Sequence, residues 1–396
     1  MLSPESSNER FRQRREQARR RRRRRRFAAV AILALAAAAS TLGARFVASH
    51  GDNGAGSGAA DESTGASAQK AKAPTPRPLP EEMRGVHVTM ALANLSGKLD
   101  EYFELADQGL NTLELDVKDE NGEVAFPSKY APLAREIGAA RPYYRPHEVA
   151  REAHANGLYL IGRVVVFEDP ILGTKRPDLA IRRPDGSVWT TSAGLAWVNE
   201  YDKRVWKYDV DVAESAARAG FDEIMFDYVR FPSDGDIASA IWPGKVNEAK
   251  GQTIMRFLEY ARSRLHPLGV RVGAAVFGLS ATRDLGIGQK PRKIARYLDT
   301  IYPMVYPSHY GSGEYDLSDP DATPGRTVSY SLRDFQKKLR GRSTKLIPWL
   351  QDFTLGETYT LTQVQDQIEA ARRYDSSGYL LWNAAGVYTD GSLEGR

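Results

Sequence analysis

From residue 84 onward, short runs of β-branched and aromatic residues alternate with longer amphipathic stretches. Strands that alternate with helices pair in parallel within one sheet. The pattern predicts an α/β domain of eight strands and seven helices, with an eighth helix short or missing. The expected strands are 85–89, 112–117, 159–167, 223–228, 271–277, 301–306, 345–350 and 379–382. The expected helices are 99–108, 146–156, 204–219, 250–265, 292–298, 331–339 and 361–374.

Several of these helices end in a glycine followed by an apolar residue, as at Gly109, Gly157, Gly220 and Gly269. Glycine supplies the left-handed turn that leads from a helix into the next strand. Eight such units in roughly 300 residues fit a (β/α)8 TIM barrel, which usually needs about 250. A doubly wound open sheet is the alternative, but no glycine-rich phosphate turn follows the first strand. We therefore predict a TIM barrel over residues 81–396.

The active site of a TIM barrel lies at the carboxyl ends of its strands. Here these ends carry carboxylates, amides and aromatic rings. Aromatic rings pack against the apolar faces of sugars, while carboxylates and amides bind hydroxyls or transfer protons. This composition is typical of a carbohydrate site. The expected substrate-binding residues are His87, Lys118, Arg163, Glu168, Tyr228, Arg230, Tyr306, His309, Trp349, Gln351, Trp382 and Asn383.

Asp227 is the strongest catalytic candidate. It ends the apolar run 224–226, where a carboxylate is costly unless it is hydrogen-bonded or charge-paired. Arg230, three residues further on, could hold Asp227 in its charged form or bind substrate. The alternative is a structural Asp–Arg pair, but a position at a strand end of a barrel favours catalysis.

Glycoside hydrolysis commonly uses a second carboxyl group, which donates a proton to the leaving oxygen. Asp352 and Asp116 are equally good candidates for this group, and Glu168 is a weaker one. Each also has a structural interpretation: Asp116 could cap a turn, Asp352 could cap a short helix, and Glu168 could be a solvated loop residue. The sequence leaves the choice between Asp352 and Asp116 open.

Other chemistries fit less well. The chain has no cysteine, which excludes thiolate metal sites, disulfides and a cysteine nucleophile. Its six histidines form no HExxH motif, and neither GxSxG nor a P-loop occurs. We therefore expect neither a metal site nor a cofactor.

Motifs at every predicted strand end carry a family resemblance. The string GFDEIMFDYVRFPSDG, at 220–235, resembles the fourth-strand signature of the putative glycosyl hydrolase domain family. The likeness continues in order through RGVHVT, LDVKDENGEV, GRVVVFEDP, GIGQ, YPMVYPSHYGSGEY, PWLQDFT and GYLLWNAAGVYT, and so covers residues 84–390. The resemblance implies a TIM barrel related to glycoside hydrolases, with Asp227 as the catalytic carboxyl of the fourth strand.

The fifth strand departs from the family pattern. Members of the family that this chain resembles often carry an aspartate at the position of Ala275, in the run VGAAVFG. If that aspartate is catalytic in the family, Ala275 favours a catalytically inactive glycan-binding protein. Asp284 could replace it only if the following loop folds inward.

The N-terminal region has the pattern of a membrane-targeting signal. Residues 1–26 end in eight consecutive arginines, and 27–44 is an uncharged apolar stretch. Arginines next to a membrane segment stay on the cytoplasmic side of the membrane. The apolar stretch has eighteen residues, which is at the short end of the roughly 17–25 residues that span a bilayer. We expect a single-pass signal anchor, with a cleaved signal peptide as the alternative. Residues 45–80, rich in Gly, Ser, Ala and Pro, predict a flexible linker.

The positive charge of the chain is concentrated in this region. The whole chain has a formal charge of +5, but residues 1–26 hold twelve arginines and three glutamates, so the remainder carries −4. A mildly acidic domain is not expected to bind nucleic acid. The sequence therefore predicts a membrane-anchored, extracytoplasmic glycoside hydrolase that acts on a cell-surface or wall polysaccharide. The enzyme would be secreted if the signal is cleaved.

Overall fold

The computed structural model of the chain describes residues 74–395. The predicted arginine-rich tail, the membrane segment 27–44 and most of the linker lie outside these residues. Within 74–395, none of the helices combines the length and the apolar composition that crossing a membrane requires.

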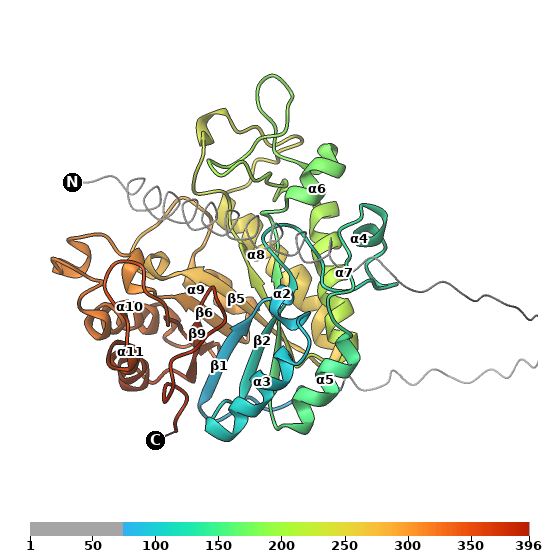
Figure 1. Cartoon of the computed structure of the whole chain (residues 1–396). Helices are drawn as coiled ribbons and strands as arrows, with labels where there is room; N and C mark the ends of the chain where they lie inside the picture. The colour runs from blue at the N-terminus through green and yellow to red at the C-terminus, as the bar shows by residue number, and fades with distance from the viewer. Residues whose placement is uncertain (1–73, 396) are drawn as a thin grey trace, which may run out of the picture. The chain divides into compact units, whose positions relative to one another are not determined.

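The strands of this region form one closed parallel barrel (Figure 1). β5 pairs with β6 and β1 pairs with β9, so the sheet has no free edge. β7 and β8 both pair with β6 and make up one barrel strand, interrupted at Pro348, which has no N–H to donate. The barrel therefore has the eight strands that were predicted. Their bounds are Met83–Val88 (β1), Thr112–Lys118 (β2), Tyr159–Val165 (β3), Glu223–Asp227 (β4), Arg271–Phe277 (β5), Thr300–Met304 (β6), Lys345–Leu346 (β7), Trp349–Gln351 (β8) and Gly378–Trp382 (β9).

Helices surround the barrel. With β7 and β8 counted as one barrel strand, each strand before β9 is followed by at least one helix. α10 begins at Pro324, ahead of the predicted start at 331, because proline is well suited to the first turn of a helix. Residues 383–395 after β9 form no helix, as predicted. The helices are Met90–Ala93 (α2), Lys98–Glu104 (α3), Pro132–Glu136 (α4), Pro146–Ala155 (α5), Pro170–Lys175 (α6), Lys203–Ala219 (α7), Lys250–Leu265 (α8), Pro291–Ile294 (α9), Pro324–Leu339 (α10) and Leu361–Arg373 (α11).

The interior of the barrel is filled by side chains. Large residues from alternate positions of the strands, among them Met225, Tyr302 and Trp349, form one buried cluster. Glu223 lies in the same interior and accepts hydrogen bonds from the hydroxyls of Tyr302 (2.8 Å), Tyr159 (3.1 Å) and Thr300. Burial raises the pKa of Glu223 to about 7. Because the centre is packed, a ligand has to bind at an end of the barrel.

Two loops form a wall above the carboxyl ends of the strands, at the top of Figure 1. They follow β3 and β4. The backbones of Arg182 and Ile241 exchange two hydrogen bonds, of 2.9 and 2.8 Å. The Trp189 indole donates to the carbonyl of Asp236 at 2.8 Å. The two loops are therefore joined into one structure beside the end of β4.

Replacing Gly378 with alanine should destabilise the closure of the barrel. Gly378 has a φ of +123°, and a Cβ there would lie 2.1 Å from the Met83 carbonyl oxygen of the neighbouring strand. We expect a loss of about 2 kcal/mol or more in the free energy of unfolding, measured with urea. Gly138→Ala is the control, because Gly138 also has a positive φ but open space around it. Equal losses in the two variants would contradict a steric role for the β1–β9 contact.

Candidate active site

A buried arginine joins two aspartates at the carboxyl ends of β2, β3 and β4. Arg163 donates through Nη1 to Asp116 Oδ1 at 2.7 Å. It also donates to Asp227 Oδ2, from Nη2 at 2.7 Å and from Nε at 2.9 Å. The three residues are only 6%, 2% and 3% exposed, respectively. Charge-assisted hydrogen bonds of this kind favour the ionised carboxylates. Arg163 is therefore the cation that neutralises Asp227.

Arg230, the partner predicted for Asp227, has other contacts. Its guanidinium donates to the Phe231 carbonyl at 3.1 Å and to Ser233 Oγ at 3.2 Å. It packs against three aromatic rings at 4.8 to 5.1 Å, those of Trp197, Tyr228 and Phe277. Of the two roles considered for Arg230, direct hydrogen bonding to Asp227 is not found, because the chain turns away directly after the strand, and substrate binding stays a prediction.

That turn is made at Tyr228. Its φ of +54° lies in the left-handed region, which is unfavourable for a tyrosine. The turn brings the Tyr228 N–H to within 2.7 Å of Asp227 Oδ1. Both oxygens of Asp227 therefore accept hydrogen bonds, and the orientation of the carboxylate is fixed.

His87 and Glu114 extend this network toward β1. Nδ1 of His87 forms a hydrogen bond with the Glu114 carboxylate, and Nε2 lies 3.9 Å from Asp116 Oδ2. Burial opposes the charge on His87, but Glu114 and Asp116 outweigh it and raise the pKa of the imidazole. Burial also raises the pKa of Glu114. Glu114 was not predicted, although it lies two residues before Asp116 and so faces the same side of β2.

His87, Glu114 and Asp116 are also the group of side chains that could hold a metal ion. Their ligand atoms lie within 4.8 Å of one another. The Arg163 guanidinium already contacts Asp116, and its positive charge disfavours a cation at this position. The arrangement is better explained by charge pairing between the buried histidine, the arginine and the carboxylates.

Lys118 lies outside the candidate site. The pairing of β2 with β3 shifts register between Asp116 and Lys118, so Lys118 leaves the alternation that places Glu114 and Asp116 inside the barrel. Its ammonium group is completely buried and lies 2.7 Å from both Asp169 and Asp209. The charge of Lys118 is satisfied by these two aspartates, and substrate binding by this residue stays a prediction.

Aromatic side chains flank the charged network. Tyr306, His309, Phe353 and Trp382 form a cluster with ring centroids 5.1 to 6.2 Å apart. Trp349 lies closer to the charges, with its ring 6.0 Å from the Arg163 guanidinium and 5.9 Å from the His87 ring. The Tyr306 hydroxyl and Trp349 Nε1 are buried and have no hydrogen-bond partner among residues 74–395.

Gln351 and Asn383 are used within the protein. Gln351 Oε1 accepts hydrogen bonds from the Ser308 N–H at 3.1 Å and from Ser308 Oγ at 2.8 Å. Its amide nitrogen donates to the Phe353 carbonyl at 3.0 Å. The Asn383 side chain donates to the Asp352 carbonyl and accepts from the Ala385 N–H at 2.8 Å. Both amides hold loops in place, in contrast to the hydroxyl-binding role predicted for them.

Asp352 follows β8 and binds the segment after β9. Its carboxylate accepts from Thr389 Oγ1 at 2.6 Å and from the Thr389 N–H at 2.8 Å. Burial raises the pKa of Asp352. The neighbouring Tyr388 hydroxyl donates to the His87 carbonyl. In place of an eighth helix, this segment therefore connects Asp352 to β1.

Glu168, Ala275 and Asp284 are three further positions at which the sequence suggested a role in the site. Glu168 is 6% exposed and pairs with Trp197 in an isolated β-bridge, so it is not a solvated loop residue. Ala275 is buried in the barrel interior. Asp284 is exposed and lies 3.3 Å from Lys290. Its loop does not fold inward, so Asp284 does not replace a carboxylate at Ala275.

Solved structures with a similar fold include two glycoside hydrolases. The glycoside hydrolase domain of PgaB (BpsB) from Bordetella bronchiseptica is 13% identical, covering 77% of this chain and 95% of that chain, with a TM-score of 0.52. The catalytic domain of β-amylase from Paenibacillus polymyxa is 11% identical, covering 80% and 95%, with a TM-score of 0.51. At these identities the likeness shows the fold.

A hypothetical protein from Ruminiclostridium thermocellum ATCC 27405 is 36% identical, covering 48% of this chain and 96% of that chain, with a TM-score of 0.43. A search of curated proteins gave no match. The profile of the family described as "Putative glycosyl hydrolase domain" matches residues 85–388. The chain therefore belongs to the putative glycosyl hydrolase domain family, as the motifs at its strand ends predicted.

Proposed function

We propose that the protein hydrolyses O-glycosidic bonds in an extracellular or cell-wall polysaccharide, using carboxylates as its acid and base. The observation that carries this proposal is the pair of buried aspartates, Asp227 and Asp116, joined by Arg163 at the carboxyl end of a barrel of this family. The aromatic rings of Tyr306 and Trp349 lie in the same part of the barrel, and Trp349 packs 6.0 Å from the Arg163 guanidinium.

Asp227 is the carboxylate that faces the developing positive charge. Its three hydrogen bonds from Arg163 and Tyr228 fix the orientation of both carboxylate oxygens. A charged, oriented carboxylate at a strand end can attack the anomeric carbon or stabilise the oxocarbenium-like transition state. We assign one of these two roles to Asp227.

The proton donor must hold a proton at the working pH. Asp116 Oδ1 already accepts a hydrogen bond from Arg163 Nη1 at 2.7 Å, so Asp116 is held against the arginine. Burial raises the pKa of Asp352, which favours the protonated form that a general acid needs. We therefore assign the proton donor to Asp352, and we assign Asp116 to positioning of Arg163.

The variant Asp352→Asn should distinguish the proton donor, Asp352, from the positioning residue, Asp116. Loss of a general acid lowers the rate by about 10²- to 10⁴-fold on a polysaccharide, whose leaving oxygen needs a proton. An aryl glycoside with a dinitrophenolate leaving group needs none, so its hydrolysis should fall by less than about 10-fold. Asp116→Asn is the matched control and should affect both substrates alike. The opposite pattern, with Asp116→Asn selective for the polysaccharide, would transfer the donor role to Asp116.

The pH dependence of the wild-type enzyme should reflect the same proton. An acid with a raised pKa is protonated below that pKa and loses its proton as the pH rises through it. We expect kcat/KM for the polysaccharide to fall on the alkaline side, and the profile for the dinitrophenyl glycoside to lack this decline. An alkaline decline of the same midpoint with both substrates would assign it to a group other than the proton donor.

The test of the activity is a panel of bacterial wall and capsule polysaccharides incubated with the purified full chain, with binding and released reducing ends measured together. Reducing ends from at least one glycan would support hydrolysis. Binding without release would favour the membrane-tethered glycan-binding protein that Ala275 suggests. In that case Trp382→Ala should lower affinity more than Asp227→Asn, because aromatic stacking would carry recognition.

We also propose that the segment 27–44 anchors the protein in the cell membrane, with the barrel on the extracytoplasmic side. The cations before this segment and the polar linker after it support that orientation. The same location would bring the barrel to the polysaccharide that we propose as substrate.

A further inference from the structure

A cluster of eight cations lies at the end of the barrel opposite the candidate site. It is formed by the segment 291–297, the end of α10 and the turn into β7. Helices run antiparallel to the strands, so these turns lie where the strands begin. We call this cluster the basal cationic patch. Its members are Arg292, Lys293, Arg296, Lys337, Lys338, Arg340, Arg342 and Lys345.

Direct contacts hold the two segments of the patch side by side. Arg292 Nη1 donates to the carbonyl of Arg340 at 3.4 Å and lies 3.5 Å from that of Lys338. Thr344 Oγ1 donates to the Ala295 carbonyl at 2.6 Å. The cations therefore share one surface, although forty residues or more separate the two segments in the sequence.

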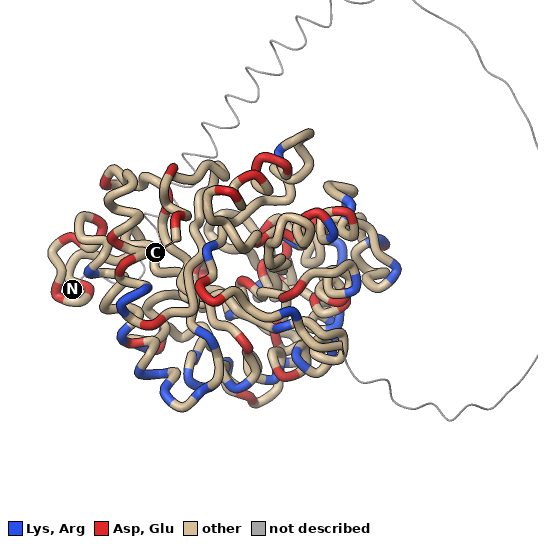
Figure 2. The backbone as a smooth tube through the Cα atoms, turned by 90° about the horizontal axis from the view of Figure 1, so that it is seen from below, with Lys and Arg blue, Asp and Glu red and all other residues tan. Residues whose placement is uncertain are grey.

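Most of these cations have no counter-charge. Lys293, Arg296, Lys338, Arg340 and Lys345 are exposed and form no ion pair with a carboxylate of residues 74–395. Lys337 lies 3.4 Å from Asp334, and the run 335–350 contains no Asp or Glu. Figure 2, seen from this end of the barrel, shows blue segments gathered toward the lower left.

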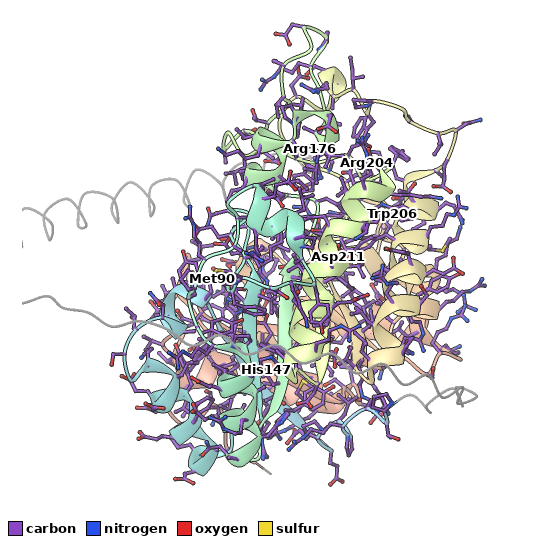
Figure 3. All side chains as sticks on the ribbon, turned by 90° about the vertical axis from the view of Figure 1, so that its right-hand side faces the viewer. Met90, His147, Arg176, Arg204, Trp206 and Asp211 are labelled. Carbon is purple, nitrogen blue, oxygen red and sulfur yellow. The ribbon has the colours of Figure 1, made fainter. Side chains whose placement is uncertain are left out.

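Two arginines at the other end of the barrel share a carboxylate. Arg176 at the end of α6 and Arg204 at the start of α7 both lie 2.9 Å from Asp178 (Figure 3). Outside residues 1–26 the chain carries a net charge of −4, so a group of eight cations, five of them exposed and without an ion pair among residues 74–395, is a local exception. A concentrated positive surface of this kind attracts anions.

The chain enters the barrel at the same end. Pro74, the first described residue, packs against Gly269 in the turn between α8 and β5. The path from the barrel to the apolar segment 27–44 therefore starts on the side of the patch. Between Ala44 and Pro74 the sequence is a polar stretch rich in Gly, Ser and Ala. A linker of this length and composition would allow the base of the barrel to reach the surface of the membrane.

We propose that the basal cationic patch binds the phosphate groups of an anionic phospholipid surface, so that the candidate site faces away from the membrane. Each lysine or arginine close to such a surface contributes about 1 kcal/mol, or roughly 5-fold in affinity. Several cations acting together would orient the barrel relative to such a surface. This proposal uses the proposed membrane location and does not depend on glycoside hydrolysis.

The absence of cysteine from the chain allows a direct test. Full-length chains with one cysteine, at Lys338→Cys in the patch or at Lys245→Cys in the loop after β4, are placed on vesicles of phosphatidylcholine with or without phosphatidylglycerol. The rate of maleimide labelling is then measured. We expect phosphatidylglycerol to slow labelling at position 338 by about 5-fold or more, and high salt to reverse this. Labelling at position 245 should not change.

Charge reversal in this background supplies the matched control. Lys293→Glu with Arg296→Glu should restore fast labelling at position 338, whereas Lys175→Glu with Lys203→Glu, an equal charge change beside α6 and α7, should not. Equal labelling of position 338 on the two kinds of vesicle would overturn the proposal. Protection by soluble polyphosphate as strong as that by vesicles would also overturn it, and would assign the patch to a polyanion in solution.

Discussion

Asp227→Asn should abolish hydrolysis and leave the fold intact. Asparagine keeps the size of the side chain, and its oxygen can still accept a hydrogen bond from Arg163. It lacks the negative charge that a nucleophile or an oxocarbenium stabiliser supplies. We expect kcat on a cleaved glycan to fall by about 10³-fold or more, with only a modest change in the free energy of unfolding. Rate and stability are measured on the same preparation.

The chain offers a matched control for this variant. Asp209 is also a buried aspartate held by a cation, with Lys118 Nζ 2.7 Å away, but it lies on α7. Asp209→Asn should cost stability and leave kcat unchanged. Full activity in Asp227→Asn would remove Asp227 from the mechanism. Equal loss in both variants would show that the effect comes from disturbing buried charge and not from chemistry.

The fold could be predicted because it repeats a local signal. Each βα unit carries its own alternation, and glycines such as Gly220 end helices where the next strand begins. The break at Pro348 and the early start of α10 at Pro324 shift boundaries without changing the order of elements. The missing eighth helix was also visible, because no amphipathic stretch follows the last strand.

The site could be predicted only in part, because its pairings are not local. Sequence spacing paired Asp227 with Arg230, whereas the barrel places Arg163 of the neighbouring strand against it. A positive φ at Tyr228 and a register shift before Lys118 are single-residue features that leave no clear trace in composition. Asp116, Asp227 and Arg163 meet because adjacent parallel strands end at the same level.

Arg163→Met should be among the most destabilising single substitutions in the barrel. It leaves the buried carboxylates of Asp116 and Asp227 without their shared cation, and an unpaired buried charge costs about 3–5 kcal/mol. Arg230→Met is the matched control. That arginine is equally buried but donates to a carbonyl and a hydroxyl, so its loss leaves the hydrogen bonds of Arg163 to Asp116 and Asp227 in place. We expect a clearly smaller loss in the free energy of unfolding, measured with urea.

A multiple-mutant cycle shows whether charge is the cause. In the triple variant Arg163→Met, Asp116→Asn, Asp227→Asn, the arginine and its two aspartates are all replaced by neutral side chains, so most of the stability lost in Arg163→Met should return while activity stays absent. If the triple variant is as unstable as Arg163→Met, the arginine acts through packing against Trp349 and not through its charge. Recovery of stability without activity would show that the two buried negative charges need the Arg163 cation for stability and that activity needs the aspartates themselves. Such an arrangement is expected where charged groups are kept for catalysis and not for folding.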